Sequence, residues 1–225
     1  YRDRGEEATR NAGWWGSRAE PQVVLMIATY NEELEVLERT IIGAKALRHK
    51  SKEILVLDDG RRDWLQDFCA AQGVGYMRRP DNLDAKAGNI NHALARLSER
   101  TVPPDFVAVL DADFVPHRGF ISRSLALFHD PSVGLVQTPQ HFFNKDPLQA
   151  NLAIRDLWPD EQRLFFDHIM ASRDAWGVAF SCGSCGVLRR EALDAVGGIP
   201  TESVTEDILT TLKMYRVGYI TRYLN

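Results

Sequence analysis

Carboxylates follow predicted strands in this chain, and their placement indicates metal-assisted chemistry on a phosphate-bearing substrate. Asp58-Asp59-Gly60 comes directly after the apolar run ILVL, and Asp111-Ala112-Asp113 comes after FVAVL. Ligands of open α/β sheets bind at the carboxyl ends of strands. Because carboxylates repel phosphates, they bind them through a divalent cation. A third acidic motif, Thr205-Glu206-Asp207, then supplies a spare carboxylate for use as a base.

The Asp111-Ala112-Asp113 motif indicates a metal site only when it is considered together with the strand before it. Alone, it is more often a solvated acidic turn. The buried strand before it favours a cation held by Asp111 and Asp113, and Mg²⁺ or Mn²⁺ suits an oxygen site that keeps positions open for phosphates. Asp58 can accept hydrogen bonds from a base or ribose, although Asp-Gly is also ordinary turn chemistry.

Other residues are candidates for contacts with a nucleotide. Tyr30 can stack on a base and Glu32 can bond its edge, but a packing tyrosine and an exposed glutamate explain them equally well. Lys86 lies near a predicted helix start. Helix N-termini bind anions, and a lysine there can bind a phosphate group through its positive charge. An ordinary solvated lysine is the commoner case.

Cys182-Gly183-Ser184-Cys185 has the C-x-x-C spacing of zinc and redox sites. No second C-x-x-C follows it, and it lies too late in the chain for a redox motif. We therefore expect buried cysteines around a Gly-Ser pair that allows close approach of a ligand. Thr205-Glu206-Asp207 by itself predicts only a helix start, with Thr205 as N-cap.

The composition excludes several classes of protein. The chain has 225 residues, a net charge of −4 and no dense Lys/Arg run, so we expect no nucleic-acid partner. Three cysteines, an odd number, argue against a secreted disulfide scaffold. No apolar run is long enough to span a bilayer, and no signal peptide is visible. The ends suggest a domain from a longer protein, with residues 1–21 as a polar linker or loosely packed lead-in anchored by Trp14 and Trp15.

Strand and helix patterns alternate along the first half of the chain, which predicts a mainly parallel sheet with right-handed crossovers. The predicted strands are 23–28, 54–57, 75–78, 106–110 and 133–137. The predicted helices are 33–48, 63–72, 85–97, 119–128, 147–176 with a break near Pro159, 189–196 and 206–216.

Taken together, these segments resemble the family 2 glycosyltransferases, and among them the processive β-glucan synthases typified by bacterial cellulose synthase. The resemblance covers about residues 22–225. The motifs that carry it, in order, are ATYNE (28–32), LDDGRR (57–62), RPDNLDAKAGNINHAL (79–94), LDADFVP (110–116), VQTPQHFFNKDPLQ (136–149), FSCGSCGVLRREALDAVGG (180–198) and VTEDILTTL (204–212).

The resemblance implies a GT-A, Rossmann-like α/β fold over 22–225 and inverting, metal-dependent transfer of glucose from UDP-glucose to the non-reducing end of a β-glucan. The implied donor contacts are Thr29, Tyr30, Glu32, Asp58, Lys86, Asp111 and Asp113. The implied metal ligands are Asp111 and Asp113, with Mg²⁺ or Mn²⁺. The implied catalytic groups are Asp58, Asp111, Asp113 and, as general base, Asp207. The implied acceptor contacts are Trp176, Cys182, Gly183, Ser184 and Glu206.

The chain departs from the family pattern in two respects. Phe114 stands where many cellulose synthases carry a histidine that can bind the metal. The identity of the polymer that the enzyme makes is therefore not fixed by the resemblance. The Q-x-x-R-W motif and the flanking membrane helices are absent from the sequence, so we expect a soluble fragment of a protein at the cytoplasmic face of the inner (plasma) membrane, with other synthase subunits among its partners.

Alternatives remain open at this point. The domain can serve another processive synthase, making a different β-glucan, a mannan or an N-acetylglucosamine polymer. It can also be a donor-binding fragment that is inactive without its C-terminal part, or a non-catalytic nucleotide-binding module. A sugar nucleotidyltransferase is disfavoured, because that class carries a Gly-rich, basic loop after the first strand, where this chain has Thr-Tyr-Asn-Glu.

Overall fold

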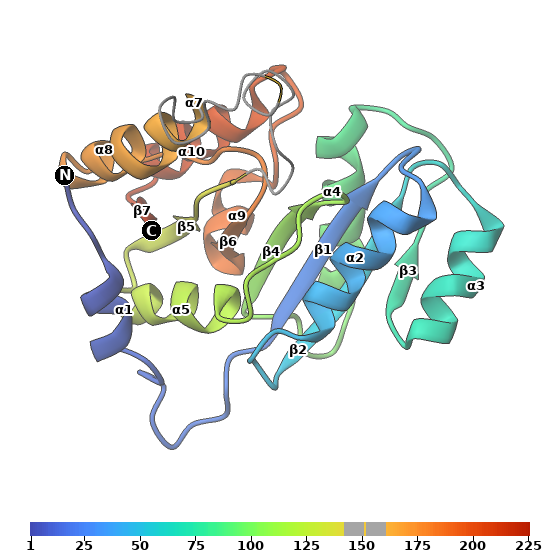
Figure 1. The fold of residues 1–225 in the computed structure, drawn as a ribbon, viewed down its shortest axis with the longest axis horizontal. Coiled ribbons are helices and arrows are strands. Elements are labelled where there is room, and N and C mark those ends of the chain that lie inside the picture. Colours follow the sequence, from blue (N-terminus) through green and yellow to red (C-terminus); the bar gives the residue numbers. More distant parts are fainter. Residues whose placement is uncertain (142–150, 152–160) are drawn as a thin grey trace.

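A seven-stranded sheet runs through the molecule, and helices lie against both of its faces (Figure 1). The computed structural model describes residues 1–141, 151 and 161–225. The strand order is β3-β2-β1-β4-β6-β5-β7. The strands are β1 (Val23–Thr29), β2 (Lys52–Asp58), β3 (Gly75–Met77), β4 (Phe106–Asp111), β5 (Val133–Gln137), β6 (Gly186–Arg189) and β7 (Ile220–Tyr223).

The sheet is mainly parallel, as predicted. Strand β1 pairs in parallel with β2 and β4, β2 with β3, and β5 with β7. The exception is β6, which runs antiparallel between β4 and β5. We did not predict β6, because four residues between a Gly-Ser loop and a helix carry no strand periodicity that a sequence pattern detects.

Apart from α1, the helices match the predicted segments closely over the described residues. They are α1 (Gly5–Arg10), α2 (Leu34–Lys45), α3 (Asp63–Gln72), α4 (Ala85–Ser98), α5 (Phe120–Ala126), α7 (Glu161–Arg163), α8 (Ala171–Ala175), α9 (Arg190–Val196) and α10 (Glu206–Arg216), with a 3₁₀ turn η1 (Leu127–His129) and a π-helical segment η2 (Leu164–Met170). Of the helix expected over 147–176, residues 147–150 and 152–160 lie outside the described residues. Within the described ranges, no helix combines the length and apolar character needed to cross a bilayer.

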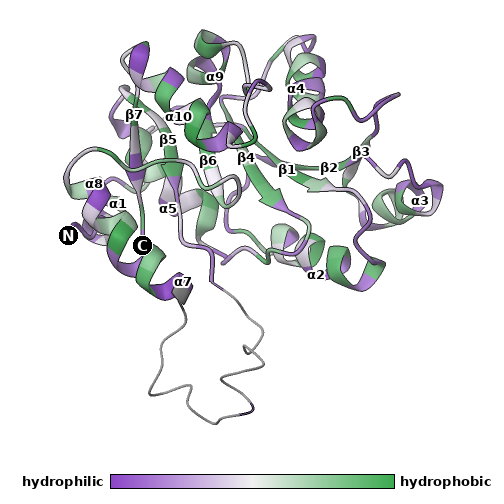
Figure 2. Cartoon of the chain, turned by 90° about the horizontal axis from the view of Figure 1, so that it is seen from above, coloured by the Kyte–Doolittle hydropathy of each residue, from purple (hydrophilic) through white to green (hydrophobic). Residues whose placement is uncertain are grey.

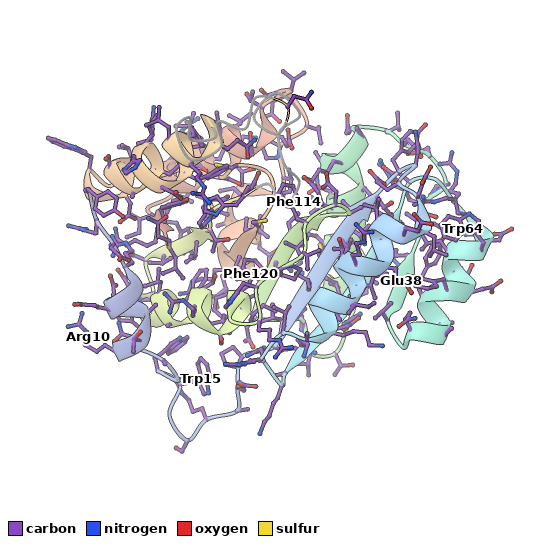
Figure 3. The ribbon with its side chains drawn as sticks, viewed as in Figure 1. Arg10, Trp15, Glu38, Trp64, Phe114 and Phe120 are labelled. Atoms are coloured by element: carbon purple, nitrogen blue, oxygen red, sulfur yellow. The ribbon has the colours of Figure 1, made fainter. Side chains whose placement is uncertain are left out.

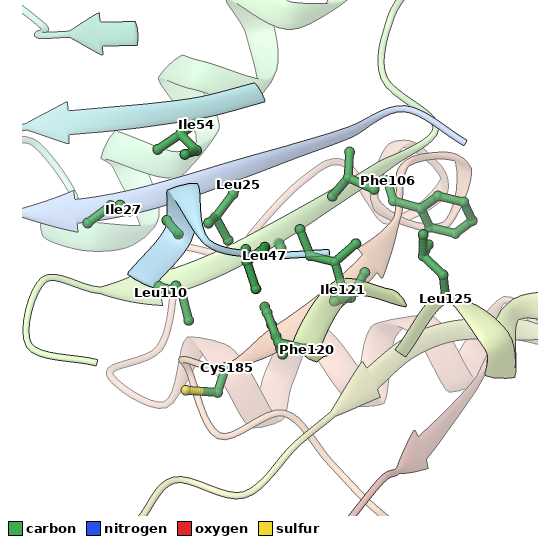
Figure 4. Close-up of a cluster of buried hydrophobic side chains, with 14 of the residues drawn as sticks. Leu25, Ile27, Leu47, Ile54, Phe106, Leu110, Phe120, Ile121, Leu125 and Cys185 are labelled. Carbon is green, nitrogen blue, oxygen red and sulfur yellow. The ribbon is translucent and has the colours of Figure 1, made fainter. Parts of the chain in front are cut away.

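The alternating side chains of the central strands build a core on each face of the sheet. Leu25 and Ile27 of β1 point to one face, where Ile121 of α5 joins them (Figure 4). Val24 and Met26 of the same strand point to the other face, which α4 and α9 cover (Figure 2). All five side chains are fully buried. A strand buried on both faces is the expected state of a continuous apolar run in a parallel sheet.

The lead-in is better ordered than the sequence predicts. Residues 5–10 form α1, which places Ala8 in the same buried cluster as the residues of α5. The indole N–H of Trp14 donates to the carbonyl of Leu125 over 2.7 Å. Trp15 lies edge-on to Trp14 and close to the core (Figure 3). The expected tryptophan anchor is therefore observed, but the lead-in also has a helix of its own.

A buried ion pair ties the lead-in to the end of the chain. The Arg4 guanidinium lies 2.6 Å from a carboxylate oxygen of Asp174 in α8, and the two residues are 3% and 0% exposed. The other oxygen of Asp174 accepts the backbone N–H of Tyr223 in β7 at 2.9 Å. One buried carboxylate thus joins α8, the last strand and the N-terminal segment.

We expect Arg4→Met to lower the free energy of unfolding by about 3–5 kcal/mol, because it leaves the Asp174 carboxylate buried without its cation. Arg2→Met is the matched control, since Arg2 is exposed. It should change stability by less than about 0.5 kcal/mol. Urea denaturation followed by circular dichroism measures both, and equal effects would show that the buried pair contributes no more than a surface arginine.

Candidate active site

Strand register brings the first two acidic motifs to one edge of the sheet. Thr29 at the end of β1 is paired with Asp58 of β2, and Ala28 is paired with Asp111 of β4. Because these strands are parallel, their carboxyl ends open on the same side of the molecule. The predicted convergence of Asp58 and Asp111 on this edge is therefore confirmed.

An open pocket of about 440 Å³ lies beside this edge. Its lining residues are Tyr30, Asn31, Glu32, Glu33, Asp59, Gly60, Arg61, Arg62 and Trp64. The Tyr30 ring is 57% exposed, so it is free to stack on a ligand rather than pack in the core. Trp64, at the start of α3, is one of these lining residues, and Figure 3 shows its position on that helix.

The Glu32 carboxylate is held in its ionised form. One of its oxygens accepts the Thr29 hydroxyl at 2.6 Å and the Tyr30 N–H at 2.8 Å. Burial acts to raise the pKa of Glu32, but these hydrogen bonds and the charge of Arg62 outweigh it and lower the pKa below its usual value. The pocket therefore presents a fixed hydrogen-bond acceptor beside an exposed aromatic ring.

Asp58 does not face this pocket. It is fully buried, and its oxygens accept the N–H groups of Gly60 and Arg62 at 2.9 and 2.7 Å, the Arg62 guanidinium at 2.9 and 3.1 Å, and the Tyr76 hydroxyl at 2.9 Å. Burial, followed by the hydrogen bond to Asp58, raises the pKa of Tyr76 to about 12, so the phenol remains a donor. In this arrangement Asp58 shapes the turn that bounds the pocket.

A second buried pair, which sequence reasoning missed, sets the start of α4. The Arg79 guanidinium bonds both oxygens of Asp59, at 2.7 and 2.8 Å, and two carbonyls of the following turn, at 2.5 and 2.7 Å. That turn contains Asp84 and Ala85 with φ of 57° and 43°, a left-handed conformation that non-glycine residues seldom adopt. The arginine thus stabilises the strained turn that aims Lys86 at the sheet edge.

Lys86 bridges the edge of the sheet and the C-x-x-C loop. Its ammonium forms an ion pair with Asp111 and donates to the Gly183 carbonyl over 2.7 Å. Asp113 is exposed. Burial, together with the charges of Asp111 and Asp113, raises the pKa of the Cys185 thiol to about 12, although the Ser184 hydroxyl and Lys86 act to lower it.

The loop itself is held by a glutamine side chain. Gln137, fully buried at the end of β5, accepts the Cys182 N–H at 2.8 Å and donates to the Ser184 carbonyl at 2.7 Å. The Ser184 hydroxyl accepts the Asp111 N–H at 2.9 Å, which fixes the loop to the end of β4. The sequence signal for this role is a single amide at the end of an otherwise apolar strand.

The two cysteines are free and differ in burial. Cys185 is buried as predicted, but Cys182 is only partly buried. Burial, and then the charge of Asp207, raises the pKa of Cys182 to about 12. Both thiols therefore stay protonated near neutral pH, which agrees with a packing role rather than a redox one.

Asp207 lies against this loop from the other side. A methyl group built on Gly183 would sit 3.5 Å from an Asp207 carboxylate oxygen, and the Gly183 φ of 78° requires glycine. Asp207 belongs to the first turn of α10, next to Glu206. Thr205 occupies the N-cap position as predicted, but its side chain makes no capping hydrogen bond. The Gly183 peptide thus lies between Lys86 and Asp207.

Trp176 does not line the pocket beside Tyr30 and Glu32. It is 85% exposed and lines a second pocket of about 400 Å³. The other residues that line this pocket are His168, Ile169, Ser172, Arg173 and Val178.

The donor set at the end of β4 fits a divalent cation of the Mg²⁺ or Mn²⁺ kind. It offers two carboxylates, Asp111 and Asp113, and the part of the chain that the structure describes holds no cluster of three or more ligating side chains. A cation of this kind normally takes one or two carboxylates and completes its shell with water and phosphate. Phe114 packs against the buried core next to this pair (Figure 3).

We expect Gln137→Leu to lower the free energy of unfolding by about 1–3 kcal/mol, because the substitution leaves the Cys182 N–H without its partner. It also removes one of the two amide donors to the Ser184 carbonyl, the other being Gln140. The amide of Cys182 should also exchange its hydrogen faster. Gln66→Leu, on the exposed side of α3, is the control and should change neither quantity. Unchanged exchange at Cys182 in Gln137→Leu would contradict the role given to this amide.

Comparison with known sequences places these motifs in a family context. Residues 24–197 match the profile of Glycosyl transferase family 2. The chain is 44% identical over 207 residues to the UDP-forming cellulose synthase catalytic subunit of Pseudomonas fluorescens, covering 91% of this chain and 27% of that protein. It is 41% identical to cellulose synthase 1 catalytic subunit of Komagataeibacter xylinus, with the same coverage of 91% and 27%. The chain thus spans about a quarter of the length of these relatives.

Solved glycosyltransferase structures share the fold. A mannosyltransferase from Pyrobaculum calidifontis, in complex with GDP-mannose and Mn²⁺, superposes with a TM-score of 0.66 at 20% identity, covering 96% of this chain and 60% of that one. Glucosyl-3-phosphoglycerate synthase from Mycobacterium tuberculosis, in complex with Mn²⁺ and UDP, gives 0.59 at 20% identity, covering 98% and 73%. These likenesses confirm the predicted GT-A fold.

Proposed function

Because the chain belongs to glycosyl transferase family 2, we propose that it forms the donor-binding and catalytic domain of a UDP-forming synthase. The proposed reaction transfers glucose from UDP-glucose, with inversion, to the non-reducing end of a β-glucan. The observation that carries the proposal is the Gly183 peptide, which lies between Lys86 at the Asp-x-Asp edge and the Asp207 carboxylate. The names of relatives at 44% and 41% identity support the choice of donor and product.

In the proposed donor complex, the open pocket takes the nucleoside. The exposed Tyr30 ring stacks on the base, and Glu32 accepts a hydrogen bond from its edge. Asp58 acts indirectly, because it holds Arg62 and the Gly60 turn that bound this pocket. Lys86 places a positive charge where the diphosphate must lie if the base occupies the pocket.

Asp111 and Asp113 are the proposed ligands of Mg²⁺ or Mn²⁺. Solved neighbours of the same fold contain Mn²⁺ with a nucleotide or nucleotide sugar, which supports this choice. When bound, such a cation stabilises the negative charge that develops on the departing diphosphate.

Asp207 is the proposed general base. Its carboxylate is partly exposed and lies against Gly183 rather than in an ion pair within the described residues. It is therefore free to take the proton from an acceptor hydroxyl. Cys182, Gly183, Ser184 and Glu206 are the proposed lining of the acceptor site, and Trp176 is proposed to extend it. In the full-length protein we propose membrane helices, a cytoplasmic active site and further synthase subunits.

We expect Asp207→Asn to lower the rate of transfer by about 10²–10⁴-fold, because the amide cannot take the proton of the acceptor hydroxyl. UDP affinity should be unchanged, since Asp207 is not a proposed donor contact. The measurement is UDP release from UDP-glucose with a cello-oligosaccharide in the full-length synthase, and calorimetric titration of UDP. Loss of UDP binding would refute the base assignment. Formation of UTP and glucose 1-phosphate when pyrophosphate is added, with no UDP released in its absence, would refute a glycosyltransferase.

We expect Asp113→Ala to remove the metal dependence of UDP binding, because a lone carboxylate holds the cation poorly. Calorimetric titration of UDP with Mn²⁺ and again with EDTA measures this. Asp67→Ala, an exposed carboxylate on α3, is the control. Equal UDP affinities for Asp113→Ala and the unsubstituted chain, with and without metal, would contradict the ligand role.

A further inference from the structure

Lys86 makes two contacts within the protein that binding a phosphate group would not require. Its ammonium is paired with the Asp111 carboxylate and also donates to the Gly183 carbonyl. The two charged side chains are 28% and 36% exposed, so the pair lies at the mouth of the site and not in the core. The lysine therefore occupies a carboxylate that the proposed function assigns to a divalent cation.

Local geometry keeps the lysine in this place. The strained turn before α4, fixed by Arg79, sets the direction of the Lys86 side chain. On the other side, Ser184 binds the backbone of Asp111 at 2.9 Å and so fixes the neighbouring Gly183 carbonyl. The ammonium thus lies between two anchored acceptors, which is the environment of a structural counter-ion.

We infer that Lys86 is an internal counter-ion that competes with the divalent cation for Asp111. Without metal, its ammonium neutralises the carboxylate, which limits the repulsion between Asp111 and Asp113. A divalent cation on the same carboxylate repels the ammonium, so metal binding must weaken the Lys86–Asp111 pair. The freed charge then becomes available to the donor phosphates. The inference rests on the proposed metal site but not on the identity of the sugar.

The bridge to Gly183 extends the effect to the acceptor side. Asp207 lies against the same glycine, 3.5 Å from where a side-chain carbon would be. A change in the Lys86 contacts therefore acts on the peptide that supports the proposed base. By this route the state of the metal site influences the loop at Cys182–Cys185.

The experiment is calorimetric titration of Mn²⁺ alone, without nucleotide, into the unsubstituted chain, Lys86→Met and Lys86→Arg. We expect Lys86→Met to bind Mn²⁺ roughly three- to ten-fold more tightly, because the competing charge is gone. Lys86→Arg keeps the charge and should match the unsubstituted chain. Lys213→Met is the control, because it also removes a lysine from an ion pair, in this case with Glu202. Neither residue is a proposed metal ligand, so the Mn²⁺ affinity should not change.

A second titration, of UDP with saturating Mn²⁺, separates this inference from the proposed function. Lys86→Met should bind UDP more weakly while it binds Mn²⁺ more tightly, and opposite signs are not expected from a merely structural defect. Tighter Mn²⁺ binding with no UDP binding in any variant would support the counter-ion and overturn the donor site. If circular dichroism shows that Lys86→Met is unfolded, Lys86→Gln, which retains a donor for Gly183, should give the same gain.

Equal or weaker Mn²⁺ affinity in the folded, uncharged variant would overturn the inference. Absence of Mn²⁺ binding in all variants would overturn both the counter-ion role and the metal site.

Discussion

The alignment of parallel strands is the constraint on which the site depends. Strands β1, β2 and β4 end at the same level of the sheet, so the residues that follow them lie side by side. This arrangement gathers Asp58, Asp59, Asp111 and Asp113 at one edge, and like charges so close would destabilise the fold. The fold therefore requires positively charged side chains next to these carboxylates.

The chain meets this demand with internal cations. Arg62 pairs with Asp58, Arg79 with Asp59 and Lys86 with Asp111, and each cation also bonds backbone carbonyls of a neighbouring loop. Neutralisation and loop placement are consequently achieved by the same side chains. The three pairs differ in burial. The first two carboxylates are nearly or fully enclosed, whereas Asp111 is partly exposed and so remains open to exchange of its partner.

Much of this architecture follows from sequence pattern. The limits of α3 and β5 are the predicted ones, and β1, β2 and β4 differ from prediction by a few residues at most. Those elements are continuous apolar runs or amphipathic helices whose periodicity is local. Four features are absent from the prediction because they depend on distant partners. Strand β6 pairs with β4 and β5, strand β7 pairs with β5, and α1 packs near α5. The fourth is the contact of the Gln137 amide with the loop at Cys182.

The sequence by itself determined which residues are candidates for the chemistry, because the acidic motifs, their strands and their order are local features of the chain. It also determined the parallel part of the sheet, since alternating strand and helix patterns permit few other topologies. Only the tertiary structure decided how each carboxylate is used. Asp58 is buried and binds Arg62, whereas Asp111 is paired with Lys86. Asp207 has no ion-pair partner among the described residues and lies against Gly183. These differences depend on burial and on contacts between residues far apart in the chain, which no spacing of residue types encodes.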